Sequence, residues 1–204
     1  MKKDNGVTLL ELLTIIAIIG IISALAYPSF RLILNRINLK KDVNQIYGDF
    51  IESKANAMEK GCDWVIIFTP DDNSYTIFSD NGIVSPGPDG SLFTADDIIN
   101  EELRNNGILD NIDGEEKTTR KVKLKFARFG VLEGVDRLAC LNQEGFPPGN
   151  GIDFPERKLR FSYLGVARSG GAVYVTNNRD QYAISVIQST GKISVCKWTG
   201  NLWK

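Results

Sequence analysis

The feature that most constrains this chain is an apolar run close to its amino terminus. From Val7 to Tyr27 the run has 21 residues, and Glu11 is its only charged side chain. An α-helix needs about 20 such residues to cross a lipid bilayer. A carboxylate within a membrane-length helix costs about 2–4 kcal/mol and therefore points to a function. We expect residues 7–28 to form a helix that lies in a membrane or in the core of an assembly.

The residues around this run form a pattern of their own. A short basic leader precedes Gly6, the apolar run starts at the next residue, and Glu11 is the fifth residue after Gly6. This pattern, with Pro28 at the end of the run, resembles the class III leader of type IV prepilins and type II secretion pseudopilins. The resemblance implies that residues 1–6 are a leader peptide, removed after Gly6 by a prepilin peptidase that also methylates Val7. Val7 departs from the family, which more often has Phe or Met there.

The resemblance also implies a role for Glu11 in assembly. In that family the glutamate pairs with the amino terminus of the adjacent subunit. In apolar surroundings each charge alone is costly, and pairing removes both penalties at one relative height of the two subunits. The implied partners are other pilin or pseudopilin subunits, the prepilin peptidase and an inner-membrane assembly platform. The implied location is the bacterial inner membrane, with a single span and a periplasmic head, and then a pilus or pseudopilus.

An ordinary secretory signal peptide is the alternative interpretation of this segment. Residues 24–26 read Ala-Leu-Ala, an A-x-A site that follows an apolar stretch and a basic start. Cleavage after Ala26 would release a soluble secreted protein. Glu11 argues against it, because a charge has no use in the apolar region of a signal peptide. The run also continues directly into an amphipathic helical pattern.

Composition limits the chemistry of the chain. It has 204 residues, a formal net charge of −1 and no histidine. The absence of histidine excludes Ser-His-Asp and Cys-His catalysis, and we expect a structural protein, not an enzyme. Three cysteines, Cys62, Cys140 and Cys196, are far apart in the sequence, so one disulfide is possible with one thiol left over. Sequence alone does not choose among the three pairings.

The helical pattern resumes over residues 29–61. Leu39, Val43, Ile46 and Phe50 follow each other at 4-3-4 spacing, which predicts an amphipathic helix with one apolar stripe. Gly61 is the expected end of this helix. The second half of the helix suits packing on one face of a sheet.

Residues 62–204 are expected to form a β-rich globular head. Two apolar segments separated by the turn signal at residues 70–73 predict a hairpin, and a strictly alternating segment predicts a half-buried strand. The expected strands are 64–68, 74–78, 121–126, 158–163, 172–176, 182–187 and 192–198. The fold class is therefore α+β, with a long amino-terminal helix packed on an antiparallel sheet. The carboxy-terminal strand pattern resembles the GspH/FimT type of pseudopilin.

A Gly/Pro/Asp-rich loop, at about residues 80–107, interrupts the strand pattern. Asp96 to Asn105 is expected to form a short helix with Thr94 as its N-cap. The sequences Gly-Pro-Asp-Gly at 87–90 and Thr-Ala-Asp-Asp-Ile at 94–98 resemble the calcium loop of major pseudopilins. The resemblance implies calcium bound by Asp89, Asp96 and Asp97 together with backbone carbonyls, although in that family the loop lies near the carboxy terminus.

Basic residues offer a second binding hypothesis. Lys121, Lys123 and Lys125 alternate along one predicted strand and share a face. A basic strand face can attract nucleic-acid phosphates, which makes a DNA-binding minor pilin for DNA uptake the alternative function. Some FimT-like pilins bind DNA through a Gly-Arg-x-Arg motif, and the matching stretch 191–194 lacks both arginines. We therefore do not expect a nucleic-acid partner. The acidic stretch 110–116 is expected to be a solvated loop.

Overall fold

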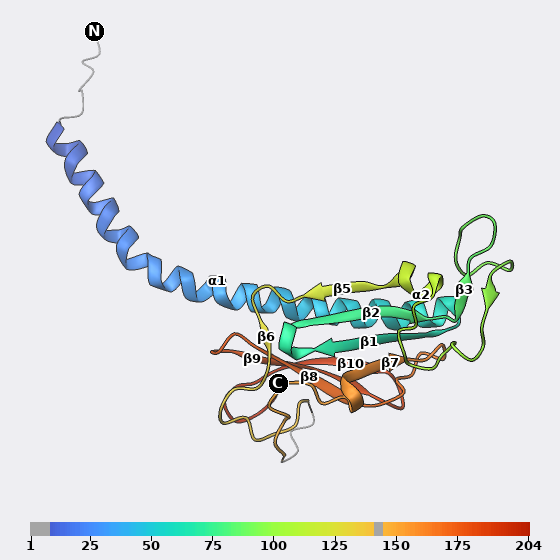
Figure 1. Cartoon of the computed structure of the whole chain (residues 1–204). Coiled ribbons are helices and arrows are strands. Elements are labelled where there is room, and N and C mark those ends of the chain that lie inside the picture. The colour runs from blue at the N-terminus through green and yellow to red at the C-terminus, as the bar shows by residue number, and fades with distance from the viewer. Residues whose placement is uncertain (1–8, 141–144) are drawn as a thin grey trace, which may run out of the picture. The chain divides into compact units, whose positions relative to one another are not determined.

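The structure is a computed structural model that describes residues 9–140 and 145–204. It has the expected α+β architecture, one long helix followed by antiparallel sheets (Figure 1). The chain divides into two compact units, residues 1–38 and residues 39–204. The elements are α1 (Leu9–Lys60), β1 (Asp63–Thr69), η1 (Pro70–Asp72), β2 (Ser74–Asp80), β3 (Ile83–Ser85), β4 (Ile98–Ile99), α2 (Asp113–Thr118), β5 (Arg120–Lys123), β6 (Arg128–Phe129), η2 (Pro155–Arg157), β7 (Lys158–Phe161), β8 (Gly171–Thr176), β9 (Gln181–Ile187) and β10 (Lys192–Lys197).

The carboxy-terminal half of α1 carries the apolar stripe that the sequence predicts. Leu39, Val43, Ile46 and Phe50 are all at most 1% exposed. The helix ends at Lys60. The next residue, Gly61, has a φ of 69°, in the left-handed region that favours glycine, and its N–H donates to a carbonyl of the last helical turn. This half of α1 is therefore anchored in the head by a continuous buried seam.

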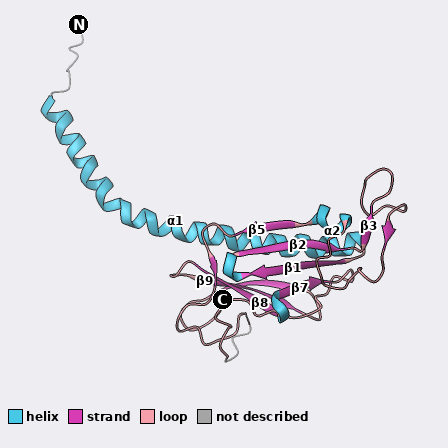
Figure 2. Ribbon diagram, in the orientation of Figure 1, coloured by secondary structure: helices cyan, strands magenta, loops and turns pink. Residues whose placement is uncertain are grey.

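Two four-stranded antiparallel sheets form the head (Figure 2). The first has the strand order β5-β2-β1-β7, and β1 and β2 form the expected hairpin over seven residue pairs. The second has the order β10-β9-β8-β6. Both sheets and α1 contribute to one core, in which the Phe50 ring makes edge contacts with Phe68 and Phe161 at centroid distances of 6.1 and 6.5 Å.

Both faces of the second sheet are buried. Successive side chains of a strand point to opposite sides, and each side of β8 packs into a different apolar cluster. On β8, Val173 and Val175 enter the main core. Ala172 and Tyr174 enter a second, smaller apolar cluster with Trp203 near the carboxy terminus. The loop that leads to the disulfide completes this second cluster, so the tail of the chain is part of the head's packing.

The interruption of the strand pattern is a long excursion between two neighbouring strands. β2 pairs with β5 in register, with Ile77 opposite Arg120, although residues 81–119 separate the two strands in sequence. We call residues 81–119 the inserted segment. It leaves the sheet at the end of β2, includes β3, β4 and α2, and returns to the next strand.

The helix expected from Asp96 to Asn105 is wrong. The structure has the short strand β4 there, with Ile98 and Ile99 paired with β3, followed by turns. Thr94 does not cap a helix, because its hydroxyl has no hydrogen-bond partner within the described part of the chain. Asp97 instead accepts hydrogen bonds from the backbone of Thr94 and Gly87, at 2.9 and 3.3 Å, and ties the loop back on itself.

The solvated loop expected at residues 110–116 is also wrong. Residues Asp113–Thr118 form α2, and Glu115 is 0% exposed. Gly114 allows α2 to lie close to Asn81 and Ile83. A Cβ at this position would lie 2.5 Å from the Ile83 side chain and 2.6 Å from the Asn81 amide oxygen.

Candidate functional site

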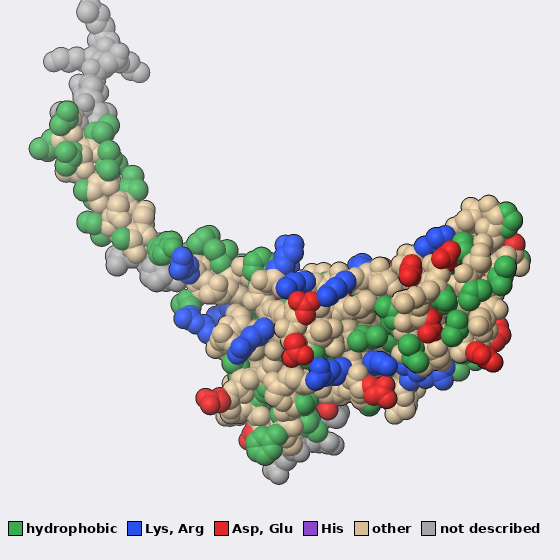
Figure 3. Space-filling view, in the orientation of Figure 1, with side chains coloured by type: hydrophobic (Ala, Val, Ile, Leu, Met, Phe, Trp, Pro, Cys, Tyr) green, Lys and Arg blue, Asp and Glu red, His purple; other side chains and the backbone are tan. Residues whose placement is uncertain are grey.

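The amino-terminal half of α1 presents apolar side chains on all sides. Leu10, Leu13 and Ile16 are 74, 63 and 60% exposed. The other exposed large apolar residues of this half are Leu9, Leu12, Ile15, Ile18, Ile19, Ile21, Ile22, Tyr27, Phe30, Leu32, Ile33, Leu34 and Ile37. Figure 3 shows hydrophobic side chains along this part of the chain. A helix that is apolar all round is normally a buried one.

Two hydroxyl side chains of this half of the helix, those of Thr14 and Ser23, bond to the helix's own backbone. The Thr14 hydroxyl donates to the Glu11 carbonyl at 2.8 Å, and the Ser23 hydroxyl donates to the Ile19 carbonyl at 2.8 Å. Such back-bonding hides the hydroxyls in the helix's own turns. Glu11 lies in the first turn of α1 and is exposed. It is therefore the one acidic side chain in an otherwise apolar helical surface from Leu9 to Ile22.

Two of the predicted site residues, Gly6 and Val7, lie outside the described residues, so the processing site stays a prediction. The sequence also predicts a membrane-spanning helix over residues 7–28. Within the part of the chain that the structure describes, none of the helices has a stretch both long and apolar enough to cross a membrane.

The three carboxylates predicted to bind calcium do not converge. Asp89 accepts the backbone N–H of Ser91 at 2.8 Å, and Asp97 accepts those of Thr94 and Gly87. Asp96 lies against Gly87, where a Cβ would clash with its carboxylate. Among the described residues, no group of three or more acidic or cysteine side chains is placed to hold a metal ion. Calcium binding therefore stays a prediction.

Two of the three predicted DNA-contacting lysines are already paired. Lys121 and Lys123 bond to the two carboxylate oxygens of Asp72, at 2.6 and 3.1 Å. These hydrogen bonds lower the pKa of Asp72 to about 2. Lys125 lies beyond the end of β5. A carboxylate shared by two lysines reduces the positive potential of this strand face, which weakens the nucleic-acid hypothesis.

Two buried aspartates fasten α1 to the rest of the head, Asp42 to the loop between β5 and β6 and Asp49 to the first sheet, and the sequence reasoning missed both. One Asp42 oxygen, Oδ2, accepts three consecutive backbone N–H groups, those of Lys125, Phe126 and Ala127, at 3.1, 2.7 and 2.8 Å. Asp42 is 2% exposed. An acidic residue one position before Val43 of the apolar stripe was the only sequence signal.

Asp49, the second of these aspartates, is 6% exposed and bonds to both neighbouring strands of the sheet. It accepts the Tyr75 hydroxyl at 2.5 Å and pairs with Arg120 at 2.9 Å. Arg120 also bonds to Glu52 at 3.0 Å. Burial and the hydrogen bond to Asp49 raise the pKa of Tyr75, so the phenol stays a donor over the whole physiological range.

A second polar centre lies where β1, β2 and β7 meet the inserted segment. Asp63 is 0% exposed and takes hydrogen bonds from Arg160 and Arg168, at 3.1 and 2.9 Å. Asp80, also 0% exposed, accepts the backbone N–H of Gly107. The positive charges of the two arginines neutralise Asp63. Arg168 alone makes two hydrogen bonds to its carboxylate.

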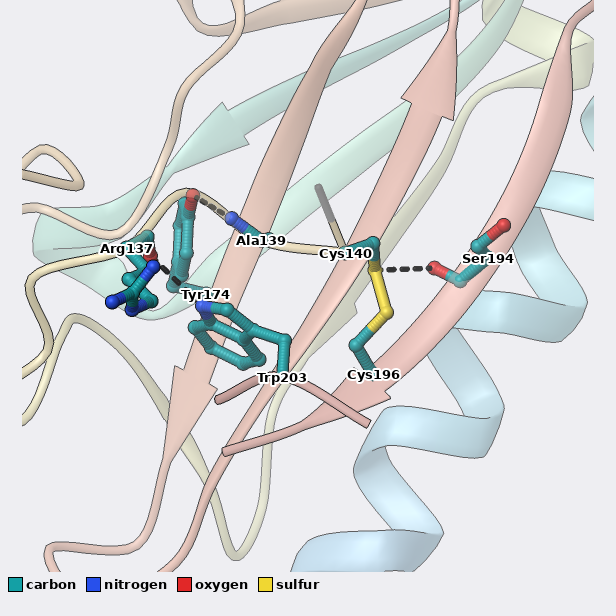
Figure 4. Close-up of a disulfide and its surroundings, with 7 residues drawn as sticks. All are labelled: Arg137, Ala139, Cys140, Tyr174, Ser194, Cys196 and Trp203. Carbon is teal, nitrogen blue, oxygen red and sulfur yellow. Dashed lines mark hydrogen bonds between the residues drawn. A yellow bond between two sulfur atoms is a disulfide. The ribbon is translucent and has the colours of Figure 1, made fainter. Parts of the chain in front are cut away.

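The structure selects one of the three possible disulfide pairings. Cys140 and Cys196 are joined, with their Cα atoms 5.6 Å apart. Figure 4 shows the bond between β10 and the loop, beside Tyr174 and Trp203. The Tyr174 hydroxyl accepts the backbone N–H of Ala139 at 3.0 Å. The remaining thiol, Cys62, is buried, and this burial raises its pKa to about 12, so it stays protonated and inert.

The fold and the amino-terminal helix define a class of protein, one with an α+β head and a long helix whose amino-terminal half is apolar and exposed. Residues 1–27 match the family described as the prokaryotic N-terminal methylation motif. Two fimbrial proteins of Pseudomonas aeruginosa are each 32% identical over 77 residues, which is 38% of this chain and 49% of theirs. The chain thus spans about half the length of the curated relatives it matches.

The motif and the fimbrial matches agree with the resemblance of the amino-terminal sequence to type IV pilins and pseudopilins. Among solved structures, the minor pseudopilin EpsH from the type 2 secretion system of Vibrio cholerae matches with a TM-score of 0.41 and 11% identity. That match covers 78% of this chain and 95% of EpsH. At this level the likeness decides neither the subtype nor the machine that the protein serves.

Proposed function

We propose that the protein is a minor structural subunit of a type II secretion pseudopilus or a type IV pilus. The observation that carries the proposal is the exposed apolar half of α1, with the single carboxylate Glu11 in its first turn. Apolar surface of this extent must be covered, by lipid before assembly and by neighbouring helices afterwards. We assign the protein no catalytic role.

The proposal includes the processing steps that precede assembly. A prepilin peptidase removes residues 1–6 after Gly6, and the new terminus at Val7 is methylated. The protein waits in the bacterial inner membrane with its head in the periplasm, and an assembly platform then inserts it beside other subunits. The motif match at residues 1–27 and the apolar sequence of this segment support these steps.

Replacing Glu11 tests assembly separately from insertion. Glu11→Ala removes the charge that pairs with the neighbouring amino terminus, while making the helix more apolar. We expect the variant to be processed and to fractionate with membranes as the wild type does, but to be depleted from sheared filaments. Glu59→Ala is the matched control, because Glu59 is an exposed glutamate of the same helix within the head half. Undiminished incorporation of the Glu11 variant would contradict the proposed pairing.

Calcium binding by Asp89, Asp96 and Asp97 is a second, separate proposal that rests on the sequence. A calcium site requires these side chains to converge, so binding must rearrange the loop. A ligand that binds only the folded state stabilises it by roughly 2.7 kcal/mol at a hundred-fold excess over its Kd. We therefore expect the melting temperature to be higher in millimolar calcium than in chelator.

Asp89→Asn is the informative variant for this test. It keeps an oxygen for the Ser91 N–H, whereas changing Asp97 would also break two loop hydrogen bonds. The calcium-dependent shift should disappear in Asp89→Asn, and the melting temperature in chelator should stay unchanged. Equal wild-type melting curves in calcium and in chelator would reject the site.

A further inference from the structure

The inserted segment is attached to the head mainly by polar contacts. Thr118 of α2 bonds to the Ser79 hydroxyl at 2.7 Å and to the Ser79 backbone N–H at 3.1 Å. The Asn105 side chain accepts the N–H of Asp63 at 2.7 Å, and the Gly107 N–H donates to Asp80. The two strands that flank the segment pair with each other directly. The segment can therefore loosen while the sheet stays intact, as a local opening.

Glu115 is a buried residue of this attachment whose carboxylate is only partly hydrogen-bonded. It is 0% exposed, and its Oε2 accepts the backbone N–H of Asp110 at 2.7 Å. Its Oε1 is buried and makes no hydrogen bond of good geometry among the described residues, although the backbone amide of Gly82 lies close enough to favour the ionised form. Asp80 shares this arrangement, since it is also 0% exposed and its Oδ1 makes no hydrogen bond of good geometry among the described residues. Burying an ionised carboxylate with an unsatisfied oxygen costs desolvation free energy. Protonating either Glu115 or Asp80 avoids part of that cost.

The charged groups around Glu115 do not neutralise it. Within the described residues Glu115 has no ion pair. Asp80 from β2 and Asp110 from the preceding loop repel its ionised form, and the thiol of Cys62 also faces this region.

Two arginines of this region bond to other groups. Arg160 of β7 bonds to Asp63 at 3.1 Å and approaches Asp80 at 3.7 Å, and Arg104 of the segment bonds to the carbonyl of Gly61 at 3.0 Å.

We propose that a proton on Glu115 holds the inserted segment against the sheet, and that ionisation of Glu115 loosens it. The neutral side chain keeps the acceptor for the Asp110 N–H and removes the repulsion from Asp80. The ionised side chain leaves a buried charge that no cation of the described residues pairs with. This proton sets how firmly the segment presents the exposed apolar side chains of Ile98, Ile99 and Ile108.

The direction of the pH effect follows from the pKa of Glu115. Burial first, and then the charges of Asp80 and Asp110, raise this pKa from 4.5 to about 7, while the backbone amides of Asp110 and Gly82 oppose the rise. In the loosened segment the pKa returns to its ordinary value. The closed form thus binds more protons. Below pH 4.5 both forms are protonated and closure is undisturbed, and closure weakens as the pH rises through 7. Over this range opening becomes at most about 300-fold easier.

Hydrogen exchange of the full chain in non-ionic detergent tests the proposal. The reporters are the amides of Gly107 and Asp110, which donate to Asp80 and Glu115, and the reference is the amides of β9. After correction for intrinsic exchange, we expect the reporters to be less protected than the reference amides, because they exchange through a local opening, and reporter protection to fall at least ten-fold from pH 5.5 to pH 8. Reporter protection that is independent of pH, or equal to that of the reference amides, would overturn the proposal.

Two variants assign the effect to Glu115. Glu115→Gln keeps an acceptor for the Asp110 N–H and cannot ionise, so its reporter protection should be independent of pH. Glu116→Gln, at the exposed neighbouring position on α2, should behave like the wild type. Persistence of the pH effect in Glu115→Gln would overturn the proposal. Asp80→Asn gives an independent test, because removing its charge should shift the midpoint of the wild-type transition to lower pH. An unchanged midpoint in that variant would contradict the arrangement of the two carboxylates.

Discussion

Asp42 gives the sharpest test of how α1 is held on the head. Its Oδ2 accepts three backbone N–H groups from a segment 83 to 85 residues away in the sequence. Hydrogen bonds to a charged group each contribute about 1.5–3 kcal/mol, but the three share one oxygen and two of the donors are only partly buried. Water can solvate those two donors after truncation. We therefore expect Asp42→Ala to lower the free energy of unfolding by about 3 kcal/mol.

Asp42→Asn separates the charge from the geometry. Since all three donors meet the same oxygen, the asparagine carbonyl can take its place and keep every bond. Only the charge assistance is lost, so we expect a cost of about 1–1.5 kcal/mol. The exposed neighbour Lys41 provides the control, and Lys41→Ala should change stability by less than about 0.5 kcal/mol.

Urea unfolding of the full chain in non-ionic detergent, followed by tryptophan fluorescence, measures these differences. The melting temperature of Asp42→Ala should fall by roughly 6–12 °C for a chain of this size. The reasoning is refuted if Asp42→Ala lies within about 0.5 kcal/mol of the wild type. It is also refuted if Asp42→Asn costs as much as Asp42→Ala, because the shared oxygen would then not be the point of attachment.

Three further outcomes follow from the same contacts. Replacing Cys140 and Cys196 together by serine should cost about 2–4 kcal/mol in unfolding free energy, measured by denaturation under oxidising conditions, whereas Cys62→Ser should leave the disulfide unaffected. Single-stranded DNA should bind only weakly and be released by moderate salt, since Lys121 and Lys123 are paired with Asp72; submicromolar affinity at physiological salt would reverse this conclusion. A fragment starting at residue 35 retains the unit 39–204 and should unfold in one cooperative transition with a mixed helix and strand circular dichroism spectrum; a spectrum of helix alone would contradict it.

Much of the fold could be predicted from periodicity. The 4-3-4 stripe of α1 and the apolar or alternating runs of β1, β2 and β7–β10 carry their own signals, because one face of each element is buried. The short elements β3, β4, β6 and α2 could not be predicted. They contain two to six residues and exist because of tertiary partners, such as the close packing of Gly114 against Asn81.

Buried polar residues explain what sequence reasoning missed in the candidate sites. Asp42, Asp63 and Glu115 look like surface acids in the sequence. The partners of Asp42 and Asp63 lie up to 105 residues away, and Glu115, whose partner Asp110 is close in sequence, is buried only by tertiary packing. Sequence patterns report which face of an element is apolar, but not which distant donor meets a carboxylate. For the same reason Asp72, which pairs with Lys121, could not be foreseen as the residue that occupies the basic strand face.

The intact mass of the protein isolated from its native cells tests the central claim most directly. Assembly through the amino-terminal helix requires removal of residues 1–6, so the account predicts a chain that starts at Val7 and carries one methyl group. A chain that starts at Tyr27 would support a secretory signal peptide, and a chain that retains residues 1–6 would show that no prepilin processing occurs. Either result would contradict the account.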